Sequence, residues 1–201
     1  MRPRIAIVAL GAANRRSIAA GIERAWGEPV FVQEPRDLDG ADGIVIPGVA
    51  NVGYLTQALD RRGLRAPVSN AVARSTPCLG ICAGFQLMFE RSEEAPNERG
   101  LGIFPGTVRR LRSPKSPHIG WNFVESSDSA FESGWAYFAH SYAPPADVAD
   151  AIAVTSYGAA FASAGSRGAA IGVQFHPERS GRYGAGILER FVLLAGGCRA
   201  C

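Results

Sequence analysis

Two short segments of the chain contain the residue types needed for nucleophilic acyl transfer. The first, residues 80–84 (Gly-Ile-Cys-Ala-Gly), places Cys82 between an apolar run and a helical pattern over residues 85–90. The flanking glycines permit the sharp strand-to-helix turn of a nucleophile elbow. The second, residues 175–178 (Phe-His-Pro-Glu), places a carboxylate two residues after His176, the spacing at which alternate strand residues share a face. A thiol, an imidazole base and an orienting acid are the parts of a Cys-His-Glu catalytic triad.

The alternative for Cys82 is a buried apolar cysteine, the commonest role of a lone cysteine. The two glycines argue against it, and a helix that begins after the thiol favours the reactive thiolate. His118 and His140 have no acid at the required spacing. We therefore predict His176 as general base and acid with Glu178 as its orienting carboxylate, the alternative being a surface strand end with an incidental carboxylate.

Acyl transfer also requires hydrogen-bond donors for the negative oxygen that develops on the substrate. An elbow supplies the backbone N–H of the residue after the nucleophile, here Ala83. We assign a second N–H to Val49, in the Pro-Gly-Val loop at residues 47–49 that follows a predicted strand. The alternative interpretation of this Pro-Gly pair is a simple turn.

Short apolar runs alternate with amphipathic stretches in the first half of the chain. They predict strands at residues 5–10, 30–32, 43–46 and 77–81 and helices at residues 17–26, 54–59 and 66–74. This order predicts an α/β fold with a mostly parallel central sheet flanked by helices. Ligands of such sheets bind beyond the carboxyl ends of the strands, where Cys82 and the loop at residues 47–49 both fall.

The second half of the chain is rich in strands. Short β-like segments cover residues 107–111, 121–125, 136–142, 151–155, 161–164 and 169–175, and a closing helix covers residues 184–194. We expect these strands to return to the main sheet before the closing helix. The sequence contains no repeat and no linker, which favours a single domain over residues 1–201.

Composition indicates an ordinary globular protein. The chain has 201 residues, of which 47% are apolar and 19% charged, and no apolar run reaches the length of a membrane span. The net charge of +3 gives no reason to expect a nucleic acid or a membrane as partner. Residues 1–14 resemble a short signal peptide, but a first strand followed at once by a helix fits them better, so we expect a cytoplasmic protein.

Four cysteines permit a C-x3-C pair and a C-x2-C pair: Cys78, Cys82, Cys198 and Cys201. A zinc site is conceivable, but Cys82 lies in the elbow and Cys201 ends the chain. A structural disulfide is equally unexpected in a cytosolic enzyme. We expect no metal and no cofactor, Cys78 in the core, and the last two cysteines on a frayed tail.

Residues 80–94 (Gly-Ile-Cys-Ala-Gly-Phe-Gln-Leu-Met-Phe-Glu-Arg-Ser-Glu-Glu) resemble the nucleophile segment of class I, triad-type glutamine amidotransferases. The chain is more narrowly similar to the glutaminase subunit of imidazole glycerol phosphate synthase. Four further segments carry this resemblance: residues 46–49 (Ile-Pro-Gly-Val), 117–122 (Pro-His-Ile-Gly-Trp-Asn), 140–142 (His-Ser-Tyr) and 172–180 (Gly-Val-Gln-Phe-His-Pro-Glu-Arg-Ser). Order and spacing agree along essentially the whole chain.

The resemblance implies a flavodoxin-like α/β fold and hydrolysis of L-glutamine to glutamate and ammonia. Cys82 would form a γ-glutamyl thioester, and His176, held by Glu178, would protonate the ammonia and then activate water. Carried over by position, the residues that bind glutamine would be Gly48, Gln86, Glu94, Ser141 and Tyr142. Glu94 would hold the substrate ammonium, the alternative being a solvated helix end.

The resemblance also implies a partner, a (β/α)8-barrel cyclase subunit that forms a heterodimer with this chain. The cyclase would receive ammonia through a tunnel and produce imidazole glycerol phosphate and an aminoimidazole carboxamide nucleotide, a step of histidine biosynthesis. His118 and Trp121 would lie at or near the interface. Partner binding would rearrange the loop at residues 47–49 and complete the oxyanion hole.

The sequence departs from the family pattern in two places. Residues 9–14 (Ala-Leu-Gly-Ala-Ala-Asn) lack the usual acid, aromatic residue and one glycine, and Ala50 replaces a glycine beside the oxyanion loop. Alanine resists a positive φ at a cost of about 1 kcal/mol or more. Three alternatives stay open: a diverged paralogue that supplies ammonia to a different synthase, another amidotransferase subunit of the class, and a non-catalytic regulatory subunit of the same fold. The intact Cys82, His176 and Glu178 count against the last of these. A thiol peptidase is a weaker alternative, since no histidine closely follows Cys82.

Overall fold

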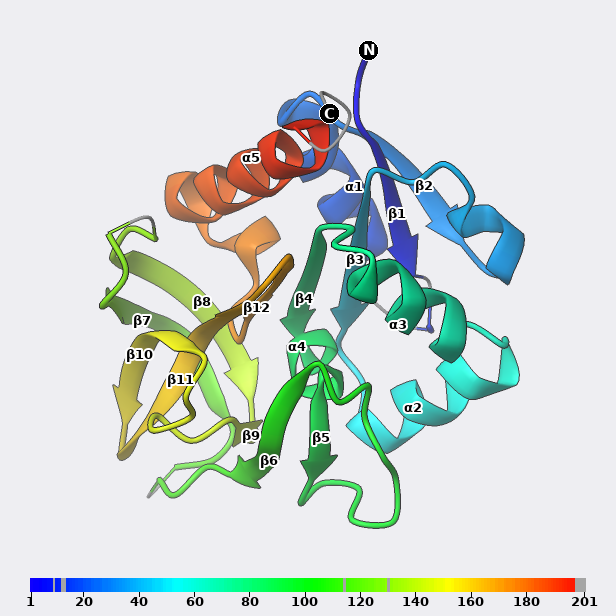
Figure 1. Cartoon of the computed structure of the whole chain (residues 1–201). Helices are drawn as coiled ribbons and strands as arrows, with labels where there is room; N and C mark the ends of the chain where they lie inside the picture. Colours follow the sequence, from blue (N-terminus) through cyan, green and yellow to red (C-terminus); the bar gives the residue numbers. More distant parts are fainter. Residues whose placement is uncertain (9, 12–13, 114, 130, 198–201) are drawn as a thin grey trace.

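Among the residues that the computed structural model describes (1–8, 10–11, 14–113, 115–129 and 131–197), nine strands form one mixed sheet (Figure 1). These strands are β1 (Arg4–Val8), β2 (Glu28–Val32), β3 (Gly43–Gly48), β4 (Cys78–Cys82), β7 (His118–Ser126), β8 (Gly134–His140), β10 (Ala151–Tyr157), β11 (Ala159–Arg167) and β12 (Ala170–Val173). Their order across the sheet is β2-β1-β3-β4-β12-β11-β10-β7-β8. A smaller sheet joins β5 (Phe89–Ser92), β6 (Phe104–Arg110) and β9 (Tyr142–Ala143).

The part of the large sheet from β2 to β12 is parallel and packs against the helices. These helices are α1 (Arg15–Arg24), α2 (Val52–Arg61), α3 (Arg65–Ala73), α4 (Ala83–Leu87) and α5 (Gly181–Gly197), with 3-10 turns at Pro35–Leu38 and Pro177–Arg179. The predicted α/β architecture, a parallel sheet flanked by helices, is confirmed.

The strands of the second half continue the same sheet in antiparallel fashion. β11, β10, β7 and β8 follow β12 as antiparallel neighbours, and Figure 1 shows them as a curved group beside the parallel strands. β12 joins the two parts because it pairs in parallel with β4 and in antiparallel with β11. The predicted return of the chain to the main sheet is therefore confirmed, and it occurs next to the strand that carries Cys82.

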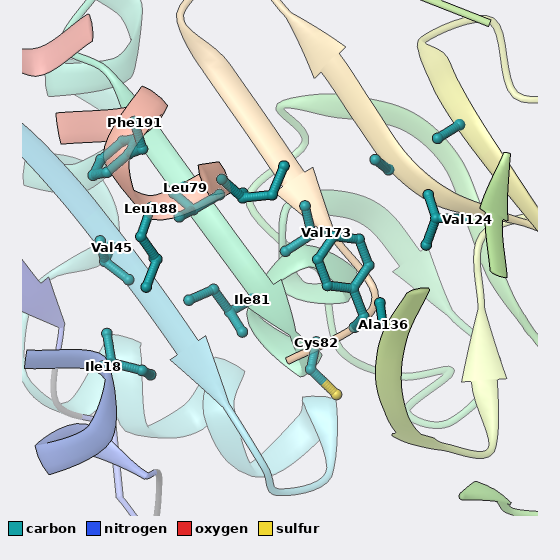
Figure 2. Close-up of a cluster of buried hydrophobic side chains, with 14 of the residues drawn as sticks. Ile18, Val45, Leu79, Ile81, Cys82, Val124, Ala136, Val173, Leu188 and Phe191 are labelled. Atoms are coloured by element: carbon teal, nitrogen blue, oxygen red, sulfur yellow. The ribbon is translucent and has the colours of Figure 1, made fainter. Parts of the chain in front are cut away.

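Side-chain alternation along the parallel strands explains why helices cover both faces. Ile5 and Ile7 of β1 join a buried cluster with residues of α1 and α5, whereas Ala6 and Val8 join a second cluster with residues of α2, α3 and α4. Figure 2 shows part of the first cluster, which includes Leu188 of α5. Strands buried on both faces read as continuous apolar runs, which is the pattern seen in the sequence.

One predicted element is wrong. The pattern over residues 85–90 predicts a single helix, but α4 ends at Leu87 and Phe89 begins β5. Phe89 pairs with Phe104 of β6, and their rings stack with centroids 5.3 Å apart. A short apolar run fits a helix or a strand equally well. Here pairing with β6, further along the chain, makes Phe89 part of a strand. The other predicted elements are present with shifted boundaries.

Two sets of predictions fall on residues outside the described ranges. The departure from the family pattern at residues 9–14 includes residues 9, 12 and 13, and the tail cysteines are residues 198 and 201. Over the part of the chain that is described, no helix has the length and apolar character to cross a membrane.

Candidate active site

Cys82 is the last residue of β4 and directly precedes α4. Its φ of 54° and ψ of −113° lie where non-glycine residues are uncommon. Along β4, Leu79 and Ile81 belong to the first buried cluster and Cys78 to the second, so alternation would place Cys82 with Cys78. Cys82 packs instead at the end of the first cluster, as Figure 2 shows. The turn therefore presents the thiol at the carboxyl end of the sheet, as a nucleophile elbow requires.

The two glycines of the elbow let neighbouring segments approach it closely. A Cβ on Gly84 would collide with the carbonyl oxygen of Ile46 in β3, and a Cβ on Gly80 would lie 2.8 Å from the Cα of Phe85 in α4. Any larger residue at either position would push β3 or α4 away from Cys82. The glycines thus allow close packing as well as the sharp turn.

His176 and Glu178 lie near Cys82 because β12 runs beside β4. Nδ1 of His176 lies 3.0 Å from Oε1 of Glu178, and Cys82 is close enough to the imidazole to raise its pKa. The two side chains are only 6% and 1% exposed. Burial alone lowers the pKa of His176, but the charge and hydrogen bond of Cys82, followed by those of Glu178, raise the pKa to about 10. The structure thus brings the three predicted triad residues together, and both Cys82 and Glu178 favour the protonated form of His176.

Backbone contacts fix His176 from its other side. Its N–H donates to the carbonyl oxygen of Tyr137 in β8 at 2.9 Å. The hydroxyl of Ser180 donates to the carbonyl oxygen of His176 at 2.6 Å and accepts from the N–H of Tyr137 at 2.9 Å. This ring of contacts ties the end of β12 to β8, so the antiparallel half of the sheet sets the position of the imidazole.

A cavity of about 240 Å³ opens over Cys82. It is lined by Val49, Ala50, Asn51, Cys82, Ala83, Gln86, Glu94, Pro117, Ile119, Ala139, His140, Ser141 and Tyr142. Both predicted oxyanion residues and all predicted glutamine-binding residues except Gly48 are in this set. Gly48 is paired with Cys82 across β3 and β4. The cavity is smaller than the pockets that enclose drug-sized ligands, which favours a small substrate.

Both hydrogens of the Gln86 side-chain amide donate hydrogen bonds to groups of the protein. Its Nε2 donates to the carbonyl oxygen of Tyr142 at 2.7 Å and to Oε1 of Gln174 at 3.0 Å. Gln174 in turn donates from its Nε2 to the sulfur of Cys82 at 3.8 Å. Gln174 is not among the predicted site residues. It precedes His176 by two residues and is a polar residue at the end of an apolar strand, which is the signal that could have found it.

Glu94 follows β5 and lies beside the start of α2. Its Oε2 accepts a hydrogen bond from the N–H of Val52, the first residue of α2, at 2.8 Å. The Oδ1 of Asn51 accepts from the N–H of Gly53 at 2.7 Å and caps the same helix. The alternative interpretation of Glu94 as a solvated helix end is wrong, because this residue is half-buried, follows a strand and lines the cavity.

Ala50 lines the cavity without backbone strain. Among the described residues other than glycine, a positive φ occurs at Trp26, Ser75 and Cys82. The conformation of the oxyanion loop in this structure is therefore one that alanine adopts freely.

His118 and Trp121, the predicted interface residues, lie in different environments. Trp121 is 55% exposed, whereas His118 is only 2% exposed. The His118 ring stacks on Tyr157, with centroids 4.0 Å apart, and on Phe138. Of the two, only Trp121 exposes its side chain, and His118 is a core residue.

No group of three or more His, Cys, Asp or Glu side chains within the described ranges could hold a metal ion. Cys78 is fully buried, and burial raises the pKa of its thiol to about 12. Such a thiol is inert at neutral pH.

Comparison with known proteins places the chain in a family. Residues 24–195 match the family model described as glutamine amidotransferase class-I. The chain is 41% identical to the imidazole glycerol phosphate synthase subunit HisH of Synechococcus sp. (strain JA-2-3B'a(2-13)), covering 97% of this chain and 94% of the relative. It is also 41% identical to the subunit HisH of Methanopyrus kandleri, covering 92% of this chain and 95% of the relative.

Solved structures agree on the fold. A crystal structure titled as a glutamine amidotransferase superposes with a TM-score of 0.80 at 18% identity, covering 96% of this chain and 98% of that one. A structure of PurLQS from Thermotoga maritima superposes with a TM-score of 0.75 at 19% identity, covering all of both chains. The chain therefore belongs to the class I glutamine amidotransferase family and, within it, to the HisH subunits of imidazole glycerol phosphate synthase.

Proposed function

We propose that this chain is the glutaminase subunit of an imidazole glycerol phosphate synthase, hydrolysing L-glutamine and passing the ammonia to a cyclase subunit. The names of the HisH relatives support this assignment. The observation that carries the chemistry is the contact of His176 with both Cys82 and Glu178 next to a small cavity.

The first half of the reaction transfers the glutamyl group to the enzyme. The Cys82 thiolate attacks the side-chain amide carbon of glutamine and forms a C–S bond, and the carbonyl oxygen becomes an oxyanion. The backbone N–H groups of Ala83 and Val49 donate to this oxyanion. The C–N bond then breaks as His176 gives its proton to the leaving nitrogen, so ammonia departs and a γ-glutamyl thioester remains.

The second half releases glutamate. His176, now neutral, takes a proton from water while the water oxygen attacks the thioester carbon. The C–S bond breaks, glutamate leaves, and the imidazolium and thiolate are restored. Glu178 keeps the imidazole in the orientation and tautomer that both halves require.

The polar groups of the cavity suit the two ends of glutamine. Gln86 uses both amide hydrogens inside the protein, so its Oε1 can accept a hydrogen bond from the substrate. The Glu94 carboxylate supplies negative charge for the α-ammonium group. Ser141, Tyr142 and the backbone of Gly48 complete the site that binds glutamine.

A stripe of exposed apolar side chains lies next to the cavity and supports a docking surface for the cyclase. Ile119, Trp121 and Phe123 alternate along one face of β7 and are 61%, 55% and 43% exposed. Trp135 of β8 is 59% exposed and lies opposite Phe123. Because Ile119 also lines the cavity, a partner on this stripe would lie at the cavity mouth. Exposed apolar patches of this kind mark protein interfaces.

The cyclase is proposed to be a (β/α)8 barrel that forms a heterodimer with this chain in the cytoplasm. It would combine the ammonia with its nucleotide substrate to give imidazole glycerol phosphate and an aminoimidazole carboxamide nucleotide. Direct transfer matters because free ammonia at neutral pH is mostly protonated and cannot act as a nucleophile.

The test is glutamate release from glutamine by the purified chain, measured alone and then with the cyclase subunit of the same organism and its nucleotide ligand. A Cys82→Ala chain serves as control in both conditions. Strong stimulation by the loaded cyclase that is lost in the control is the expected result.

Two other outcomes are informative. Cys82-dependent hydrolysis that the cyclase leaves unchanged would favour a different ammonia acceptor, the diverged-paralogue alternative. No Cys82-dependent hydrolysis in either condition would favour a regulatory subunit.

A further inference from the structure

A continuous chain of hydrogen bonds joins β7 to the sulfur of Cys82. In order, its members are Asn122, His118, His140, the carbonyl of Tyr142, Gln86, Gln174 and Cys82. The donor–acceptor distances in the same order are 3.4, 3.2, 2.9, 2.7, 3.0 and 3.8 Å, the last one to sulfur. The two histidines are outside the triad, so the chemistry proposed above leaves them without a role.

Elementary hydrogen-bond chemistry fixes the direction of every bond in the histidine part of the chain. The carbonyl of Tyr142 can only accept, so Nδ1 of His140 must carry the proton. In a neutral imidazole Nε2 is then an acceptor, and Nδ1 of His118 must donate to it. That leaves Nε2 of His118 as an acceptor, and the amide nitrogen of Asn122 faces it.

The surroundings of both rings keep them neutral. His118 and His140 are 2% and 6% exposed, and burial lowers the pKa of His118 to about 4 and that of His140 to about 3. Both rings contact Phe138 and Phe161, and His118 also stacks on Tyr157. A protonated ring would turn Nε2 of His140 from an acceptor into a donor and break the link to His118.

The Tyr142 carbonyl links the two histidines to Gln86, which lines the cavity. It accepts from His140 and from Gln86, which uses both lone pairs. The second hydrogen of Gln86 goes to Gln174. The amide nitrogen of Gln86 therefore faces the protein, and Oε1 is its only remaining group for a ligand.

We infer that His118 and His140 are positioning residues for glutamine hydrolysis: as a pair of Nδ1–H tautomers they hold the Tyr142 carbonyl, which orients Gln86 toward the substrate. The inference rests on the proposed roles of Cys82 as nucleophile and of Gln86 in binding glutamine. Asn122 anchors the outer end of the pair, because its Nδ2 also donates to the carbonyl oxygen of Ser156 at 3.0 Å.

The first test reads the tautomers of the unmodified protein by two-dimensional 15N–13C NMR of the histidine rings at pH 7. We expect His118 and His140 both to be neutral with the proton on Nδ1, which is the minor tautomer of free histidine. An Nε2–H tautomer or an imidazolium at either position would overturn the inference. This measurement depends neither on activity nor on a variant that must fold.

The second test compares two substitutions at His140. His140→Phe keeps a ring but loses both hydrogen bonds, whereas His140→Asn retains a donor near the Nδ1 position for the Tyr142 carbonyl. Cys82 is then labelled with 6-diazo-5-oxo-L-norleucine, a glutamine analogue that must occupy the binding site, and with iodoacetamide, which needs only the thiol. We expect H140F to slow labelling by the analogue about tenfold, the effect of one lost hydrogen bond, with little change for iodoacetamide, and H140N to recover most of the rate.

Equal slowing of both reagents in H140F would overturn the inference, since it would show general damage to the fold. Unchanged labelling by the analogue in a folded H140F chain would overturn it as well. Failure of the proposed function is recognised separately, because then the analogue labels the natural chain no faster than a Cys82→Ala control, whereas iodoacetamide still alkylates Cys82.

Discussion

His176 and the His118–His140 pair are all at most 6% exposed, yet the pKa of His176 is raised while those of His118 and His140 are lowered. Burial lowers the pKa of each of the three rings. Around His176 this effect is reversed by Cys82 and Glu178, which raise the pKa to about 10. Among the described residues, no carboxylate or thiol raises the pKa of either ring of the pair, and the charge of His176 lowers that of His140 further. The rings face each other, a carbonyl, an amide and aromatic side chains.

The difference shows that the neighbouring groups, rather than the depth of burial, determine the direction in which the pKa of each histidine shifts. A ring that faces negative groups stores a proton and can give it to a leaving group. A buried ring that faces carbonyl and amide groups stays neutral, so one of its nitrogens donates and the other accepts a hydrogen bond. The two proposed roles therefore lie next to one cavity, and substitutions can test each of them separately.

Removing the sulfur is the change with the largest expected effect. Cys82→Ala should reduce glutamate release at least about a thousandfold, because the nucleophile is lost. It also removes the largest cause that raises the pKa of His176, so that pKa should fall from about 10. NMR titration of His176 checks the second point. A His176 pKa that is unchanged in the variant would contradict the role given to the sulfur.

Removing the charge of Glu178 should have the next largest effect. Glu178→Gln keeps the shape of the side chain but no longer stabilises the imidazolium, and we expect kcat to fall about a hundredfold or more. The pKa of His176 should also fall, although less than in Cys82→Ala, since the glutamate is the smaller contributor. NMR titration of the His176 ring in the variant and in the natural chain measures this shift.

The neutral pair should make the fold sensitive to acid. Its pKa values in the folded state, about 4 and about 3, lie below the ordinary value of 6.5. The unfolded chain therefore binds protons first, and the free energy of unfolding should decrease as the pH falls below 6.5, by up to about 1.4 kcal/mol per pH unit for each ring.

Urea unfolding at pH 7 and pH 5 measures this slope. A double variant with asparagine at positions 118 and 140 serves as control and should lose less stability between the two pH values. Asp37 and Asp60, whose pKa values lie below 3.8, titrate outside this range. An equal slope in the double variant would assign the acid sensitivity to other groups.

The smallest effect is expected at Tyr157, whose ring stacks on His118. Tyr157→Leu should lower the free energy of unfolding at pH 7 by about 1 kcal/mol, the size of an aromatic pair contact. It should also let water approach His118, so its pKa should rise toward 6.5 and the acid sensitivity should shrink. NMR titration of His118 in both chains checks the direction, and a further fall of this pKa would contradict it.

The triad and the parallel strands could be predicted because their signals are local. Cys82 lies between glycines in a strand-to-helix junction, and Glu178 follows His176 at strand spacing. The first strands are buried on both faces, so their apolar runs are visible without knowledge of the tertiary contacts.

The features that the sequence did not reveal depend on contacts between distant residues. Phe89 begins a strand because it pairs with Phe104, not because of its own neighbours. His118 lies in the core because Phe138 and Tyr157 cover its ring. The contact between Gln174 and Cys82 requires β12 to lie beside β4. Local spacing cannot specify any of these three arrangements.

The positive φ of Cys82 affects which substitution is favoured at this position in a lineage that loses the catalytic activity. A cysteine at φ 54° holds a backbone conformation that costs about 1 kcal/mol or more and that glycine adopts freely. A lineage that no longer needs the reaction would therefore gain backbone stability by drifting from cysteine to glycine at this position. At position 82, selection for catalytic activity favours cysteine, whereas selection for folding stability favours glycine.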